Sequence, residues 1–247
     1  MCLLWMSNVL VEASNLSSPE NETWNYSIRY KYGLVVMKAG TANYRLQTAN
    51  YKGNPALKSS LNLKTNPFFD KIFLLRDTLM SYSTLPDFHP LYHHRTVHEG
   101  NTHFKEEIRV QKFGEKYTEL HIKRIQDEKI RIDTLLTMPN AGYDVVNIFL
   151  YLRQLNYSDL NPGDNLHIST FLGKKKANLI IRYVKPVQIE RSNKQQRKAF
   201  HLTIDVSNEV FSEAKNAMEV WISDDEYHIP LKIKAKLKIG AMEADLM

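Results

Sequence analysis

Residues 23–32 read Thr-Trp-Asn-Tyr-Ser-Ile-Arg-Tyr-Lys-Tyr, and this stretch decides the class of fold. Large side chains fall on every second position, and polar side chains fill the positions between them. The large ones are Trp24, Tyr26, Ile28, Tyr30 and Tyr32. Successive side chains of an extended chain point to opposite faces, so a period of two predicts a strand with one buried and one solvated face.

The same alternation recurs along the chain. Polar and apolar residues alternate over 117–124 and 129–132, and Asp127-Glu128 predicts a hairpin turn between them. From Leu231 to Ile239 apolar residues alternate with lysines, which predicts a last strand with one apolar face and one face of lysine alone. Further strands are predicted at 34–50, 56–64, 74–84, 90–99, 103–113, 166–172, 177–190, 199–206 and 217–223. We therefore expect an all-β protein, either a large curved antiparallel sheet or a partly open barrel or sandwich.

One convincing helix interrupts the strands. Asp144 is suited to cap its N-terminus, and apolar residues recur at helical spacing as far as Leu155. The opposite side carries Val146, Leu150 and Tyr151, so we expect a helix near 144–155 that is buried on both sides, inside the curved sheet. A shorter helical turn is predicted at 67–73, whose three phenylalanines need cover.

The N-terminal residues predict export. Residues 1–11 are mostly apolar, and Val11-Glu12-Ala13 has the small-residue spacing that a signal peptidase recognises, so 1–13 is interpreted as a signal peptide. Because no Lys or Arg precedes the apolar run, either the true start lies upstream or the segment has another role. We expect a flexible tether over 14–22 and then a single β domain over 23–247, with a soft boundary near 137–142.

Composition limits the classes of protein to which the chain can belong. Of the 247 residues 43% are hydrophobic, which is enough for a sizeable core, and no stretch after the leader approaches the roughly 20 apolar residues of a membrane-spanning helix. Cys2 is the single cysteine, so an internal disulfide and a cysteine-rich zinc site are excluded. The net charge of +6 is compatible with an anionic partner, although acidic and basic residues are interleaved.

Enzyme motifs are nearly absent. The chain has no Gly-x-Ser-x-Gly elbow, no phosphate-binding glycine loop, no dinucleotide fingerprint and no His-Glu-x-x-His. Residues 89–103 contain five histidines, of which His98 and His103 would face each other across a turn at Gly100-Asn101. A zinc or copper site there, and with it a metal-dependent hydrolase, is the minor alternative to exposed hairpin histidines. We expect no enzyme activity, no cofactor and no metal.

The lysine stripe near the C-terminus has two interpretations. It consists of Lys232, Lys234, Lys236 and Lys238, spaced about 6.6 Å apart along a strand. Such a face suits anionic lipid or an envelope polymer, but the favoured interpretation is a solvated edge strand that lysine protects from further pairing. Nucleic acid is not expected as a partner, because this basic face carries no aromatic side chains on which bases would stack.

Several segments, taken in order, resemble a bacterial family known as domain of unknown function 3108. The resemblance rests on Tyr26-Ser27-Ile28-Arg29-Tyr30-Lys31-Tyr32-Gly33 with Ala39-Gly40-Thr41-Ala42, on the helix at 144–153 with Gly163-Asp164, and on Trp221-Ile222-Ser223-Asp224-Asp225 with Pro230 and Gly240. Asn147 stands where this pattern has a serine. The resemblance spans about 23–246 and implies a periplasmic or cell-envelope protein of a Gram-negative bacterium, with a curved sheet that half-encloses a helix. It implies no reaction.

Two function classes follow. The first is a binding module whose concave face holds an apolar or amphipathic ligand, such as a lipid or glycolipid. Its ligand-pocket candidates are Trp24, Tyr26, Phe68, Phe69, Phe73, Phe149 and Trp221. Buried aromatics are also ordinary core residues, so these side chains have a structural interpretation as well. The second class is a structural or assembly factor that contacts an envelope protein or polymer through sheet edges or the lysine face.

Overall fold

A computed structural model describes residues 21–114, 116–139, 142–191, 194–208 and 214–247. The predicted signal peptide over 1–13 and residues 14–20 of the predicted tether lie outside the described residues. The first strand begins at Glu22, one residue before the expected start of the folded part.

Fifteen strands within the described residues form one sheet. The first eight are β1 (Glu22–Tyr32), β2 (Val35–Tyr51), β3 (Asn54–Thr65), β4 (Arg76–Ser83), β5 (Pro90–Glu99), β6 (Thr102–Lys112), β7 (Tyr117–Gln126) and β8 (Lys129–Pro139). The others are β9 (Gly142–Asp144), β10 (Asn165–Leu172), β11 (Lys175–Glu190), β12 (Gln196–Asn208), β13 (Ala214–Ser223), β14 (Pro230–Lys236) and β15 (Ala241–Leu246). Two short helices, α1 (Pro67–Asp70) and α2 (Ile148–Gln154), and a 3-10 turn at Tyr157–Asp159 complete the elements.

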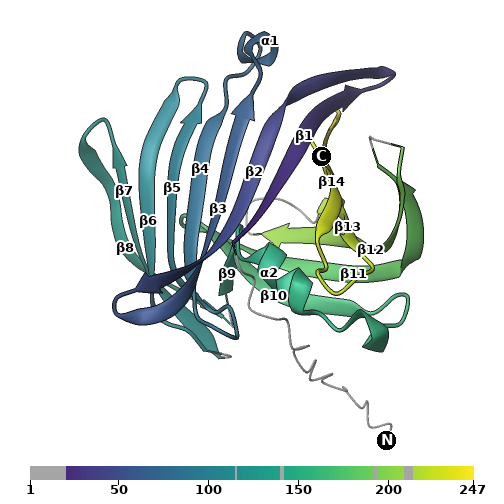
Figure 1. Cartoon of the computed structure of the whole chain (residues 1–247). Coiled ribbons are helices and arrows are strands. Elements are labelled where there is room, and N and C mark those ends of the chain that lie inside the picture. The colour runs from purple at the N-terminus through teal and green to yellow at the C-terminus, as the bar shows by residue number, and fades with distance from the viewer. Residues whose placement is uncertain (1–20, 115, 140–141, 192–193, 209–213) are drawn as a thin grey trace, which may run out of the picture.

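The sheet consists of two antiparallel meanders joined through the chain ends. β1 to β8 pair in sequence, β10 to β15 pair in sequence, and β15 pairs with β1 through the register of Tyr26 with Leu246. β8, which ends at Pro139, lies at one end of the strand order, and β9, which begins at Gly142, lies at the other. Figure 1 shows β1 to β8 as a curved wall, with the later strands curling beneath it around α2.

The two ends of the sheet meet by packing. β9 and β10, at one end, lie against β6 to β8 at the other end. Phe171 of β10 is fully buried in a cluster with Ile108, Leu120, Ile122 and Met138 of β6 to β8. At β9 the Gly142 N–H donates to Thr118 Oγ1 of β7 at 3.1 Å. The expected fold class is therefore confirmed as a mostly β, nearly closed, barrel-like sheet.

A buried ion cluster marks the point of closure. Glu106 of β6 is fully buried, and its two carboxylate oxygens accept from Arg95 Nε at 2.8 Å and from Arg124 Nη2 at 2.6 Å. Gly173, in the β10–β11 turn, has φ +62° and rests directly on this cluster. A Cβ on Gly173 would lie 2.9 Å from atoms of both Arg124 and Glu106. Glycine therefore serves two needs here, the left-handed turn and the close approach.

The central helix forms, but it begins later than predicted. α2 starts at Ile148, and Asp144 lies in β9, where its carboxylate accepts from the N–H groups of Val146 and Asn147. Asp144 thus caps the turn that leads into the helix rather than the helix itself. α2 lies between two clusters of the core, with Leu150 in the first and Leu152 in the second.

Two other predictions need correction. The lysine alternation does not form one strand to Ile239, because β14 ends at Lys236, the chain turns at Gly240 and β15 follows. β14 is an inner strand between β13 and β15, so its lysines protect no edge. Lys232 and Lys234 pair with acidic side chains of the neighbouring strands, namely Glu219, Glu243 and Asp245.

Replacing Gly173 with alanine tests the closure. We expect Gly173→Ala to lower the free energy of unfolding by about 1–3 kcal/mol more than Gly100→Ala, because the added methyl meets a buried ion cluster. Gly100 is the matched control, since it occupies a two-residue hairpin turn at φ +55° with open space around its Cβ position. Urea denaturation measures both variants. Equal losses would show that Gly173 is required for the turn alone.

Candidate functional site: an apolar cavity between the sheet and the central helix

A partly open cavity of about 160 Å³ lies between the sheet and α2. Its walls come from five neighbouring strands of the sheet, β3, β2, β1, β15 and β14, and from α2. The lining residues are Trp24, Tyr26, Ile28, Ala42, Tyr44, Leu61, Leu63, Phe149, Ile233 and Ala244. The two hydroxyls among them are already engaged, as Tyr26 donates to Pro230 O at 2.9 Å and Tyr44 donates to Val146 O at 3.3 Å. The cavity therefore presents hydrocarbon and aromatic rings.

The register of the strands explains why a cavity exists here. Tyr26, Ala42 and Leu63 form one row across β1, β2 and β3. A second row runs from Ile28 through Ala244 to Ile233 across β1, β15 and β14. In each row an alanine stands between two large side chains on the same face, and the missing side-chain volume leaves a space.

Aromatic stacking makes the wall of the cavity rigid. Trp24 stacks on Tyr44 with ring centroids 4.9 Å apart and planes 7° apart, and Phe149 of α2 meets the Tyr44 ring edge-on at 5.8 Å. The Arg153 guanidinium lies over the Trp24 ring, 4.9 Å from its centroid, and donates to Tyr227 O at 2.8 Å. Stacked and cation–π contacts of this kind hold rings in one orientation.

Burial perturbs the two tyrosines of the cavity. Loss of hydration disfavours the phenolate and raises the pKa of Tyr26 and of Tyr44 above the ordinary value for tyrosine. Both rings therefore stay neutral throughout the physiological pH range. The site carries no charge of its own, which suits an apolar group.

The seven predicted pocket residues divide among three places. Trp24, Tyr26 and Phe149 line the cavity. Phe69 is buried next to it in the same core cluster, where its ring meets Tyr30 at 5.9 Å. Trp221 lies outside this cavity, stacked on His201 at 4.7 Å with Lys232 above it.

Phe68 and Phe73 also lie outside the cavity. Their side chains are exposed, by 62% and 47%, so the expectation that all three phenylalanines of the 67–73 segment find cover is wrong. Only Phe69 turns inward, because α1 is a single turn of helix and presents one face to the sheet.

Tyr44, two alanines and four aliphatic residues of the lining were not predicted. The period-two pattern places Ile28 on the face of Trp24 and Tyr26, and this signal was available in the sequence. The pairing of β1 with β15 joins residues more than 200 positions apart, and no local pattern gives that register.

A buried polar cluster joins three strands and was also missed. The Ser81 hydroxyl donates to Asp144 Oδ1 at 2.8 Å and lies 2.9 Å from His93 Nδ1. A hydrolytic triad needs the imidazole to bridge, with Nε2 on the serine and Nδ1 on the carboxylate. Here the serine and the carboxylate both meet the Nδ1 side, and all three side chains are at most 1% exposed. The arrangement fixes β9 against β4 and β5.

The histidine hairpin has the predicted geometry. His98 and His103 face each other across the β5–β6 turn with ring centroids 3.8 Å apart. Among the described residues no group of three or more His, Cys, Asp or Glu side chains is placed to hold a metal ion. The zinc or copper alternative therefore gains no support from the described part of the chain.

A family model for proteins of unknown function, DUF3108, matches residues 25–247. The chain belongs to the DUF3108 family. This match confirms the resemblance seen in the sequence and covers the sheet from the fourth residue of β1 onward. A search of curated proteins found no match.

One similar solved structure is the "Beta-barrel-like Protein of Domain of Unknown Function DUF1849 from Brucella abortus". The two structures superpose with a TM-score of 0.61 over 92% of this chain and 96% of that chain, at 6% sequence identity. The likeness extends to the fold and not to any activity. Within the described residues of this DUF3108 protein, no helix has the length and apolar character needed to cross a membrane.

The raised tyrosine pKa values predict alkaline unfolding. In the unfolded chain a tyrosine has a pKa of about 10, and in the folded protein the pKa of Tyr44 is higher. Below about pH 10 the tyrosine is neutral in both states. Above about pH 10 it ionises in the unfolded chain alone, so the free energy of unfolding falls as the pH rises. We expect Tyr44→Phe to make the fall in unfolding free energy above about pH 10 shallower by about 1.4 kcal/mol per pH unit. Urea denaturation across this range measures the slope. Tyr32→Phe, an exposed ring, is the control, and identical slopes for the two variants would contradict the assignment.

Proposed function

We propose that this DUF3108 protein is a non-enzymatic binding module of the Gram-negative periplasm or cell envelope, which holds the apolar part of a lipid-like molecule in the cavity between the sheet and α2. The observation that carries the proposal is the cavity itself: about 160 Å³ of space against ten side chains, with both hydroxyls already bonded to backbone oxygens. Protein interiors are normally packed without such space.

The size of the cavity limits the ligand. An engineered apolar cavity of about 150 Å³ binds benzene. A space of similar volume takes one ring or a short length of a single hydrocarbon chain, and two acyl chains do not fit. We infer that the polar part of the ligand stays outside, next to the half-buried residues Leu61, Leu63 and Ile233.

The non-enzymatic part of the proposal rests on the chemistry of the two polar clusters. Ser81, His93 and Asp144 are fully buried in a non-catalytic geometry, and Glu106 is enclosed by two arginines. Neither cluster contributes a residue to the cavity lining. The alternative of an assembly factor acting through the lysine face has less support, because Lys232 and Lys234 are paired within the sheet.

Filling the cavity tests the proposal. Ala42→Leu adds a side chain into the space between Tyr26 and Leu63. We expect wild-type protein to bind straight-chain alkanoates, with affinity rising by about 0.8 kcal/mol per CH₂ until the cavity is full. We expect Ala42→Leu to abolish this binding while unfolding free energy stays equal or rises by about 1 kcal/mol. Titration followed by the fluorescence of Trp24 in the cavity wall measures binding.

The matched control is Ala49→Leu on the same strand. Ala49 lies seven residues from Ala42 in an unbroken register, so its side chain points to the other face of β2. This variant should bind alkanoates as wild type does. Absence of alkanoate binding to the wild type, or equal binding by Ala42→Leu, would contradict the proposed site.

A further inference from the structure

Three turns at one end of the sheet carry exposed apolar side chains together with lysines. They are the β1–β2 hairpin, the β3–β4 loop that contains α1, and the β14–β15 turn. The exposed apolar residues of this basic-apolar rim are Tyr32, Leu34, Val35, Val36, Phe68, Ile72, Phe73, Leu237 and Ile239. Its exposed lysines are Lys31, Lys38, Lys64, Lys71, Lys236 and Lys238.

Strand pairing brings the three turns together. β14, β15, β1, β2 and β3 are consecutive neighbours in the sheet, with Lys31 opposite Ala241 and Thr41 opposite Lys64. The β14–β15 turn contacts β1, since Tyr30 donates to Ile239 O at 3.1 Å. The α1 loop contacts β2, since Asn66 N donates to Ala39 O at 2.9 Å. Sequence segments about 200 residues apart thus form one continuous surface.

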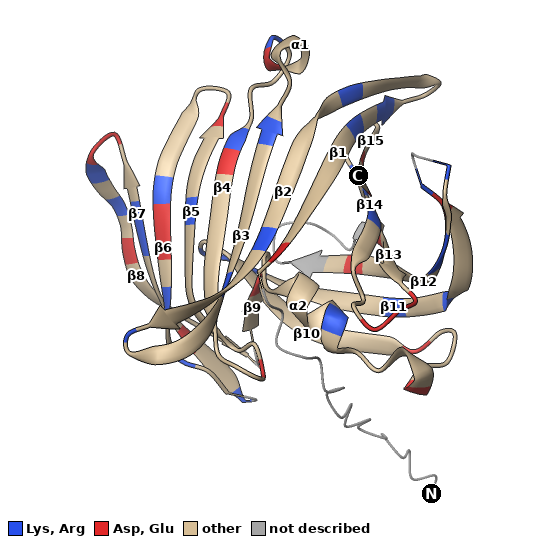
Figure 2. Cartoon of the chain, viewed as in Figure 1, with Lys and Arg blue, Asp and Glu red and all other residues tan. Residues whose placement is uncertain are grey.

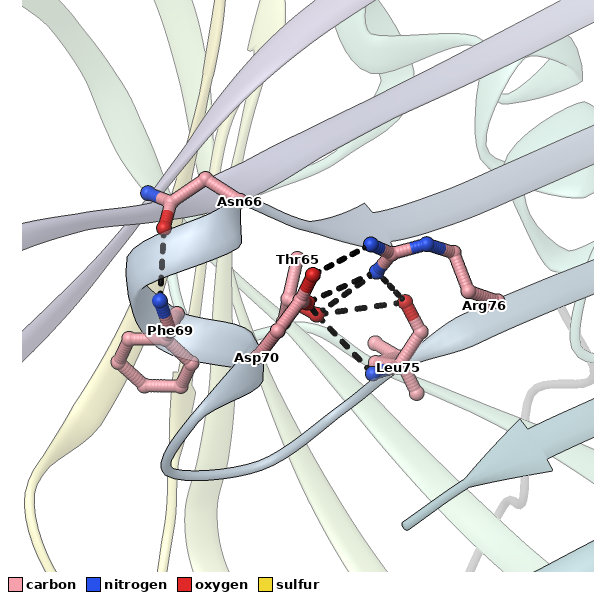
Figure 3. Close-up of polar contacts among 6 residues, drawn as sticks. All are labelled: Thr65, Asn66, Phe69, Asp70, Leu75 and Arg76. Carbon is pink, nitrogen blue, oxygen red and sulfur yellow. Dashed lines mark hydrogen bonds and ion pairs between the residues drawn. The ribbon is translucent and has the colours of Figure 1, made fainter.

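The α1 loop is held so that its apolar residues project outward. The Asn66 side chain accepts from Phe69 N at 2.8 Å, and Asp70 pairs with Arg76 at 2.6 Å across the loop (Figure 3). These contacts turn Phe69 inward against Tyr30. Phe68 is left exposed by 62% at the outer side of an anchored turn.

The charge of the rim identifies what covers it. The segments 31–38, 64–73 and 236–240 contain six lysines and one acidic residue, Asp70, which Arg76 neutralises. Figure 2 shows the basic residues of β1, β2 and β3 at the end nearest α1. Exposed apolar side chains mark an interaction site, and lysines among them match a surface that is negative at its boundary and apolar beneath.

We propose that the basic-apolar rim docks on the surface of an anionic lipid bilayer, with the apolar side chains inserted between headgroups and the lysines on the phosphates. Leu34 at the hairpin tip is fully exposed and leads the insertion. Tyr30, Phe69 and Ala39 of the rim end belong to the same core cluster as the cavity residues Trp24 and Ile28. The rim and the cavity therefore share one core cluster.

Vesicle flotation tests the docking. The full chain is mixed with vesicles of phosphatidylcholine alone or of phosphatidylcholine with phosphatidylglycerol. We expect wild type to float with the anionic vesicles and to release at high salt. Lys31→Glu/Lys38→Glu/Lys71→Glu should weaken binding at least about tenfold. The control Lys52→Glu/Lys185→Glu/Lys198→Glu makes the same change in net charge on exposed lysines away from the rim and should keep most of the binding.

A second pair of variants tests the apolar contribution. Leu34→Ser/Phe68→Ser should lose binding to anionic vesicles, whereas Ile130→Ser/Leu135→Ser, exposed on β8, should not. All rim variants should keep wild-type alkanoate binding and thermal unfolding, which separates failed docking from a failed cavity or misfolding. The proposal is overturned if wild type ignores anionic vesicles, if both lysine triples lose binding equally, or if the rim instead buries itself in a dimer that Leu34→Ser/Phe68→Ser dissolves.

Discussion

The contact of the β10–β11 hairpin with the inner face of β6 to β8 is the interaction on which the rest of the structure depends. The two end strands of the fifteen-stranded sheet, β8 and β9, are not paired with each other. Without the hairpin contact, the sheet would stay open and its apolar inner face would be exposed to water. Burying Phe171 among Ile108, Leu120 and Met138 removes apolar area from water and holds β10 against β6 to β8. Gly173 permits the approach, and the Glu106 ion cluster supplies the surface on which the turn rests.

This closure positions α2, and α2 in turn positions the cavity. The segment after β9 leads into α2 in the interior, and the hydrogen bond from Ser81 to Asp144 fixes its start. The helix then divides the interior into two clusters and directs Phe149 against Tyr44. Ala42 and Ala244 each stand between two larger side chains of neighbouring strands, and they leave the space that a ligand would fill. Fold and site are thus linked through one hairpin contact.

Much of the fold could be predicted from the sequence, because apolar and polar residues alternate along a half-buried strand and this alternation is visible in the sequence. The alternation over 23–32 predicted β1 almost to its boundaries, and Asp127-Glu128 forms the expected turn with φ of 52° and 57°. The errors also have physical reasons. The alternation from Leu231 to Ile239 continues across a turn, so it concealed the end of β14 at Lys236. β15, with Ala-Met-Glu-Ala-Asp-Leu, lacks the β-branched residues that mark a strand.

The site was less predictable, because it depends on register between distant strands. Trp24, Tyr26 and Phe149 were identified as large aromatics, but nothing local distinguishes them from Phe68 or Trp221, which lie elsewhere. If the cavity holds a hydrocarbon group in the cell, native mass spectrometry of protein purified from its own cell envelope will detect it. We expect a bound species that solvent extraction releases and that is then identified as a molecule with a hydrocarbon chain. Protein of unliganded mass, with no lipid or glycolipid in the extract, would contradict it.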